Sequence, residues 1–186
     1  MTGPFITDWV YGGTLAGVLL LCLVPLLTRG WTRAQMLTFL LLPVYMIHQG
    51  EEHAWDRFRT FFNATIGHGH EVLSSFAVFI INVPGVWGVI AISAWLAVRR
   101  DPGFGLIAAY LVLVNGIAHT VNGVMLGSYN PGLVSALAVF IPLGAYSVWQ
   151  IGRATAHKRA AHAGGLALAI AIHGAIMVYA LGHAPA

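Results

Sequence analysis

Long apolar runs separated by short polar breaks make up almost the whole chain. A membrane span needs about 20 mostly apolar residues, and six segments meet that requirement. Glycine, proline and basic residues fall between them, as is typical of breaks between helices. The pattern therefore predicts an all-α integral membrane bundle that forms a single domain over residues 1–186. The expected spans are 9–28, 36–60, 72–98, 104–127, 132–152 and 163–183.

The composition supports a membrane protein. Hydrophobic residues make up 58% of the chain and charged residues 8%, whereas a soluble domain carries about 25% charged residues. The net charge of +3 does not indicate nucleic acid binding, because the nine basic residues are spread over short loops. We therefore expect membrane lipid, and no nucleic acid, as a partner.

The basic residues also predict an orientation. Seven of the nine follow the first, third and fifth spans, and only Arg57 and Arg59 fall on the other side. Lys and Arg are enriched in cytoplasmic loops. The distribution predicts that both termini lie on the outer side of the membrane. We expect this membrane to be a bacterial plasma (inner) membrane.

Residues 48–56 (HQGEEHAWD) interrupt the second apolar run with a dense polar cluster. Ionisable groups at membrane depth are costly and usually mark a functional site. His48, Glu51 and Glu52 are spaced to share one sector of a helix. Two adjacent glutamates in hydrocarbon cannot both stay ionised without a cation or a shared proton. The cluster therefore predicts a metal site or proton chemistry.

Other spans carry polar residues at a similar depth. In the fourth span, Asn115, His119 and Asn122 form one stripe, and His173 lies near the middle of the sixth. At about 1.5 Å per residue, the expected depth below the outer surface is roughly 10–18 Å for His48, Glu52, Asn82, Asn115, His119 and His173. At the start of the third span, the spacing of Glu71, Ser75 and Asn82 predicts that the three side chains share nearly one helix face. The shared depth predicts one buried site that opens to the outer half of the bilayer.

Imidazoles and carboxylates are the ligands of zinc, iron and manganese sites. We expect catalytic roles for His48, Glu51 and Glu52. The expected metal ligands are His48, Glu51, Glu52, His119 and His173. Residues expected to orient these ligands are Asn115, Asn122 and Asn82, and those expected to give access or a further ligand are His53 and Glu71. Two carboxylates with several imidazoles suit a dinuclear centre, which slightly favours iron over zinc.

The leading hypothesis is a membrane-embedded, metal-dependent enzyme, an oxygen-activating oxidoreductase acting on a small apolar or lipid-like substrate. Zinc would instead indicate a hydrolase. The alternatives are a metal-free acid–base isomerase or cyclase on an isoprenoid-like substrate, a proton or metal transporter, and a structural membrane partner. The inner half of the bundle has few polar residues, which argues against a transport path.

Three motifs resemble those of the HXXEE domain family, which consists of small multi-helix membrane proteins without an established function. Residues 48–52 (HQGEE) resemble its signature, and residues 115–119 (NGIAH) resemble its second motif. Residues 129–135 (YNPGLVS) resemble the segment that opens its following helix. The resemblance covers roughly residues 36–150. It implies a site at His48, Glu51, Glu52, Asn115 and His119 but no particular reaction.

Overall fold

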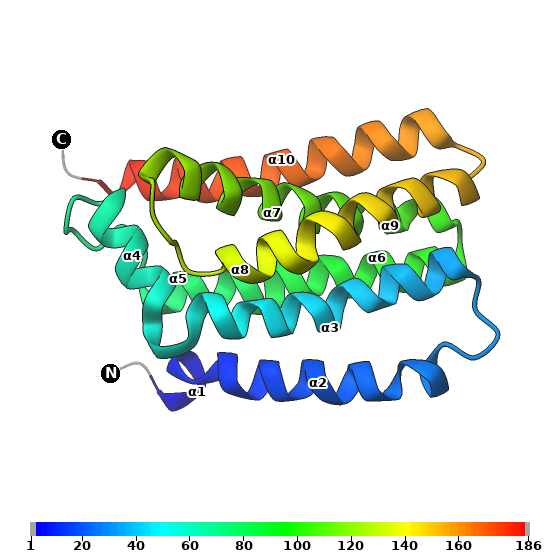
Figure 1. Cartoon of the computed structure of the whole chain (residues 1–186), viewed down its shortest axis with the longest axis horizontal. Helices are drawn as coiled ribbons and strands as arrows, with labels where there is room; N and C mark the ends of the chain where they lie inside the picture. The colour runs from blue at the N-terminus through cyan, green and yellow to red at the C-terminus, as the bar shows by residue number, and fades with distance from the viewer. Residues whose placement is uncertain (1–2, 185–186) are drawn as a thin grey trace.

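The computed structural model describes residues 3–184, and every regular element in that range is a helix. Long helices run side by side in one bundle (Figure 1). Five helical segments are long and apolar enough to cross a membrane, which confirms the prediction of a membrane helical bundle. These segments are Trp9–Leu27, Ser75–Arg99, Pro102–Leu126, Leu133–Ala154 and Lys158–Gly182.

A sixth long helix, α3 (Arg33–His53), has 21 residues but a polar last third. Its start is fixed by a capping box in which the Thr32 and Gln35 side chains bond to each other's backbone amides. The helix ends at His53 because Trp55 and Asp56 adopt left-handed φ angles of 55° and 60°. The chain then turns through η1 (Ala54–Asp56) into α4 (Arg57–Thr65). The predicted span 36–60 is therefore not one helix.

Two of the spanning segments contain a widened, π-helical turn. One segment consists of α5 (Ser75–Ile80), the π segment η2 (Ile81–Trp87) and α6 (Gly88–Arg99). Pro84 lies inside η2 and lacks the N–H that a regular turn requires. The other segment consists of α8 (Leu133–Ser135), the π segment η4 (Ala136–Phe140) and α9 (Ile141–Ala154). Such turns are frequent at functional sites.

The core of the bundle forms around α7 (Gly105–Leu126), which follows the short η3 (Pro102–Phe104). In its spanning window, 50% of the residues are buried, against 17% for both α2 (Trp9–Leu27) and α10 (Lys158–Gly182). Leu106, Leu111 and Val112 of α7 are fully buried. This helix packs against α3, α6, α9 and α10. The outer faces of α2 and α10 expose apolar side chains, as lipid-facing helices do.

The two ends of the bundle differ in charge. One end, here called the α4 end, carries α4 and both ends of the described chain, including the short α1 (Pro4–Thr7) (Figure 1). The connections after α2, α6 and α9 lie at the opposite end. The seven basic residues noted above lie in or next to these three connections. At this end, the connection after α9 is joined to the connection after α6, because the Thr155 hydroxyl donates to Asp101 Oδ1 at 2.6 Å.

Candidate metal centre

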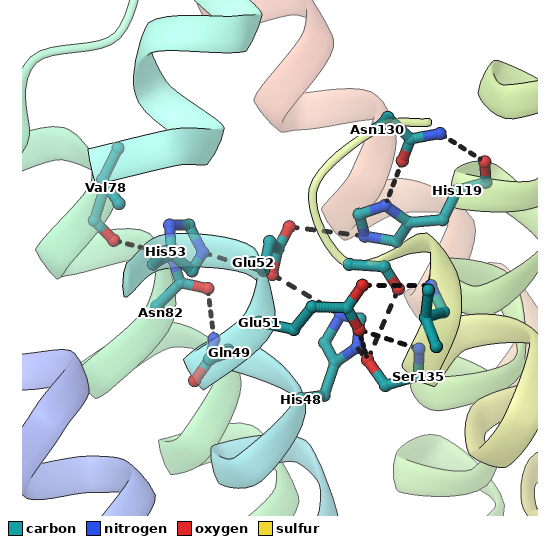
Figure 2. Close-up of polar contacts among 12 residues, drawn as sticks. His48, Gln49, Glu51, Glu52, His53, Val78, Asn82, His119, Asn130 and Ser135 are labelled. Carbon is teal, nitrogen blue, oxygen red and sulfur yellow. Dashed lines mark hydrogen bonds and ion pairs between the residues drawn. The ribbon is translucent and has the colours of Figure 1, made fainter. Parts of the chain in front are cut away.

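The last two turns of α3 present polar side chains in three directions. His48 and Glu52 are four residues apart and share the face that meets His119 of α7. Gln49 bonds to η2, and Glu51 bonds to α8 (Figure 2). Consecutive helical residues differ by about 100° in direction, so Glu51 and Glu52 diverge. Their spacing predicts one shared sector, but the structure separates the two carboxylates.

Two imidazoles meet the carboxylate of Glu52. His48 Nε2 lies 3.6 Å from Glu52 Oε2, and His119 Nε2 lies 3.3 Å from Glu52 Oε1. One ligand atom from each of the three residues lies within 4.8 Å of the other two. All three residues are buried, with exposed fractions of 5% or less for the whole residue. Among residues 3–184, this group has the spacing and ligand types to hold a metal ion.

The orientation of His48 is fixed by a hydrogen-bonded chain on its other nitrogen. The Ser135 hydroxyl donates to the Glu51 carboxylate, so its oxygen is left to accept from His48 Nδ1–H at 2.7 Å. The proton on Nδ1 leaves a lone pair on Nε2. This Nε2 atom is buried and has no hydrogen-bond partner among the described residues. A carboxylate behind an imidazole is the usual support for a metal-binding histidine.

His119 is fixed in the same way by a different residue. Its Nδ1 lies 2.8 Å from the Asn130 side-chain oxygen, which can only accept a hydrogen bond. Asn130 Nδ2 donates to the His119 backbone oxygen at 2.9 Å, which sets the direction of the amide. His119 Nδ1 must therefore carry the proton. Its Nε2 lone pair, like that of His48, points toward Glu52 (Figure 2).

The three groups therefore meet as acceptors. Two imidazole lone pairs face one carboxylate in a space without an N–H or O–H between them. Acceptors in contact in a buried site repel one another unless a cation or an added proton lies between them. The hydrogen bonds behind His48 and His119 thus prepare the site for a positive charge.

A third imidazole touches the same carboxylate from the opposite side. His53 Nε2 lies 3.2 Å from Glu52 Oε2, and its side chain is 6% exposed. The ring packs against Trp9 and Phe58, with centroid distances of 5.3 and 5.1 Å. The sequence analysis gives His53 a role in access or as a further ligand. The structure places it beside Glu52 but outside the group of three.

Gly132 holds the connection between α7 and α8 close to the rings of His48 and His119. Its φ angle is +95°, which favours glycine. A Cβ atom here would lie 2.8 Å from His119 Cε1 and 3.0 Å from His48 Cε1. The glycine therefore lets the backbone approach both imidazoles and closes that side of the site.

A cavity of about 350 Å³ opens beside Glu52 and His119. Most of its wall is apolar, with side chains such as Phe61, Leu73 and Ile176. Helix α4 contributes Phe58 and Phe62 to this wall and turns its charged residues away from it. Small-molecule sites are commonly apolar cavities with a few polar groups of this kind.

The cavity occupies only the half of the bundle near the α4 end. Its wall extends toward the opposite end no further than Tyr45, Val86, Asn115 and Ile172. Beyond these residues the bundle interior is filled by side chains such as Ile90 and Leu111, which are fully buried. Within the described chain, the site is therefore a blind cavity rather than a passage.

Glu51 is committed to the start of the helix that follows Gly132. Its carboxylate accepts from the backbone N–H groups of Val134 and Ser135 at 3.0 and 2.8 Å, and from the Tyr129 hydroxyl at 3.0 Å. A carboxylate at a helix N-terminus is favourable. Burial and the bond to Glu51 raise the pKa of Tyr129, so its hydroxyl remains a donor at neutral pH. Glu51 thus supports His48 without contacting Glu52.

The three predicted orienting asparagines have other positions. Asn115 and Asn122 line the cavity, and among the described residues the His119 ring is held by Asn130 and not by either of these side chains. Asn82 accepts from Gln49 Nε2 and donates to the Val78 carbonyl at 2.8 Å. Gln49 also accepts from the Trp87 indole, so it fastens α3 to η2.

His173 and Glu71 lie apart from the group of three. His173 lines the cavity, and its Nδ1–H donates to the Ala169 carbonyl at 2.8 Å. Glu71 is exposed and pairs with Arg59 at 3.1 Å in the loop before α5. The predicted helical face of Glu71, Ser75 and Asn82 does not form, because the helix begins only at Ser75.

Three residues of the site, Ser135, Asn130 and Gly132, are not among those predicted from the sequence. All three fall in residues 129–135, for which the sequence indicates only a family motif. Their signal was the dense Asn-Pro-Gly turn followed by a serine, since such turns position backbone and short polar side chains. The other contacts of the site join residues that are far apart in the sequence, so the sequence pattern alone does not predict them.

The fold and the site define an integral membrane bundle with a buried histidine–carboxylate centre near one end. A family model described as a protein of unknown function with HXXEE motif matches residues 39–147. This match covers more than half of the chain, which therefore belongs to the HXXEE family. The motif residues are His48, Glu51 and Glu52, the first and last of which face His119. No curated protein and no solved structure gives a significant match.

Proposed function

We propose that this protein is a membrane-embedded, metal-dependent enzyme that acts on a small apolar or lipid-like substrate. His48, Glu52 and His119 would hold one metal ion, and the adjoining cavity would hold the substrate. The observation that supports this most strongly is the pair of Nε2 lone pairs aimed at Glu52. In both histidines the other nitrogen is already occupied by Ser135 or Asn130.

A single ion is proposed in place of the dinuclear centre expected from the sequence. A second ion would need a further carboxylate, and Glu51 is occupied by the amides of α8. Two imidazoles and one carboxylate are the ligands of ferrous oxygenases and also of some catalytic zinc sites. Bound iron would supply oxygen activation, and bound zinc would supply an activated water. We favour iron because the apolar wall suits an unactivated hydrocarbon better than a polar ester or amide.

The residues of the chain would perform three tasks. Glu52 would provide negative charge to the metal, and Ser135 with Glu51 would keep the His48 lone pair available. His53, which touches Glu52 at 3.2 Å, would hold or transfer a proton beside the reacting centre. The phenylalanines of α4 would exclude water from the cavity.

The location of the site follows from the predicted orientation. We propose that α3 is a sixth span and that the α4 end faces the outer side of a bacterial plasma membrane. The basic connections at the opposite end support this direction. The substrate cavity would then lie in the outer half of the bilayer, where an apolar molecule dissolved in lipid can reach it.

Metal content of protein purified in detergent without chelators tests the proposal. We expect one metal ion per chain in the wild type by mass spectrometry, and its loss in Glu52→Gln and His119→Ala. Matched controls are Glu71→Gln and His68→Ala, which change the same residue types at exposed positions and should keep the metal. Glu51→Gln should weaken metal affinity by about 10- to 100-fold, as loss of a supporting group does.

The result also separates the alternatives. Zinc in place of iron would direct the search for a substrate toward hydrolysis. A folded wild type that neither retains iron, zinc or manganese nor binds them on addition would contradict the metal proposal. The three imidazoles around Glu52 would then favour proton-transfer catalysis without a metal.

A further inference from the structure

The wall of the cavity contains a polar group without a partner. Asn115 lines the cavity on α7, one turn from His119. Its side-chain oxygen is buried and has no hydrogen-bond partner among the described residues. Buried acceptors are nearly always paired in proteins, because an unpaired one loses its bond to water without replacement. Asn115 therefore indicates a ligand group that donates a hydrogen bond.

A second acceptor faces the same space. His173 of α10 uses Nδ1–H to donate to the Ala169 carbonyl at 2.8 Å, which leaves Nε2 as an acceptor. Its side chain lines the cavity together with Asn115, and α10 packs directly against α7. Two neighbouring helices thus supply acceptors to one cavity. A ligand that carries a hydroxyl can satisfy them, whereas a pure hydrocarbon cannot.

The remaining wall fits an apolar body, and exposed apolar side chains border the cavity near the α4 end. Near the α4 end, the cavity is bordered by Met125, Leu126 and Met177, which are 79%, 48% and 38% exposed. In a membrane, exposed apolar side chains at the end of a spanning helix contact lipid. Asn115 lies deeper, toward the middle of the bundle. A ligand that enters from the bilayer would therefore place its polar group at the deep end.

We infer that the ligand of this cavity is a membrane-dissolved amphiphile with an apolar body and one hydroxyl group, and that Asn115 accepts the hydrogen bond from this hydroxyl. The inference rests on the proposed function for the identity of this cavity as the substrate site. Asn115 and His119 are four residues apart on one helix face, or about 6 Å along the axis. The part of the ligand beside Glu52 and His119 therefore lies about 6 Å from its hydroxyl.

Binding of a matched set of probes tests the inference. The protein is placed in phosphatidylcholine nanodiscs, and tritiated dodecanol is displaced by unlabelled dodecanol, dodecyl methyl ether or dodecane. We expect the ether and the alkane to compete about tenfold more weakly than the alcohol, because neither can donate to Asn115. Asn115→Leu should remove this preference. Thr120→Val, which removes a polar group from the same helix outside the cavity wall, should keep it.

The outcomes distinguish this inference from the metal proposal. Glu52→Gln should lose the metal but keep the preference for the alcohol, so a failed metal proposal would leave the preference intact. Equal competition by alcohol and ether in the wild type would overturn the inference, as would a preference that persists in Asn115→Leu. Absence of saturable dodecanol binding in the wild type would also overturn it. If Asn115→Leu does not fold, the comparison of probes in the wild type decides alone.

Discussion

The His48 and His119 rings are each oriented by what their Nδ1 atom contacts. His48 depends on Ser135 and Glu51, and His119 depends on Asn130. Ser135 and Asn130, which contact the two rings directly, both lie in residues 129–135, whereas Glu51 lies on α3 and acts through Ser135. The lone pairs that face Glu52 therefore depend on one short segment, residues 129–135, as well as on the last turns of α3.

Gly132 gives the sharpest residue-level prediction. Gly132→Ala should lower the free energy of unfolding by more than the roughly 1–2 kcal/mol of a left-handed backbone, because its Cβ also meets both ligand rings. It should weaken metal binding as well. Chemical unfolding in detergent and metal competition measure the two effects.

Gly127→Ala is the matched control for this prediction. Gly127 also has a positive φ, +59°, but a Cβ there has open space around it. This variant should show only the backbone cost and keep the metal. Equal effects of the two substitutions would show that contact with the imidazoles is unimportant.

At the residue scale, the sequence was sufficient to predict three residues that meet. His48, Glu52 and His119 followed from polar residues at similar depth in apolar helices, and the structure brings them together. The direction of Glu51 could not be predicted in this way. It depends on the N-terminus of α8, which reaches α3 only through the fold. The same is true of Asn130, whose partner is eleven positions away across a turn.

At the element scale, hydrophobic runs predicted the helices but not their interruptions. The break after α3 comes from two left-handed residues, Trp55 and Asp56, neither of which is a glycine. An Arg59–Asp56 ion pair and a cation–π contact of Arg57 with Trp55 at 4.5 Å accompany the turn. Composition does not reveal such a turn, because these contacts exist only once the chain has folded back.

Gln49 joins α3 to the widened turn η2, and its removal should be costly. Gln49→Leu would leave the Asn82 oxygen and the Trp87 indole without their present partner. We expect a loss of about 1–3 kcal/mol in the free energy of unfolding. Thermal unfolding in detergent measures it. The control Gln150→Leu changes an amide whose bond within residues 3–184 is to the exposed Tyr146 hydroxyl, and it should be nearly neutral. A neutral Gln49→Leu would contradict this role.

At the scale of the whole molecule, the candidate site and most of the basic residues lie at opposite ends of the bundle. The cavity and the His48–Glu52–His119 group belong to the α4 end, and the basic connections belong to the other. The alternation of connections between the two ends agrees with the predicted order of spans. Charge patterns predict this arrangement well because they depend on loops and not on packing.

Cysteine labelling tests the direction of the bundle. In a Cys22→Ser background, His68→Cys at the α4 end should react with an impermeant maleimide in intact cells. Arg100→Cys at the opposite end should react only after the cells are made permeable. Both positions are exposed, so access depends on the side of the membrane. The reverse pattern would overturn the proposed orientation and place the cavity in the inner half of the bilayer.

The widened turns η2 and η4 have a consequence for how relatives of this chain diverge. A π turn holds one residue more than an α turn, so it is the form that a single-residue insertion takes inside a helix. Deleting that residue would restore a regular helix and rotate everything beyond it by about 100°. A deletion in η2 would turn Asn82 away from Gln49. A deletion in η4 would move Phe140 away from His48, whose ring centroid now lies 4.0 Å from that of Phe140. A one-residue gap at 81–87 or 136–140 should therefore mark relatives in which this site is rebuilt or lost.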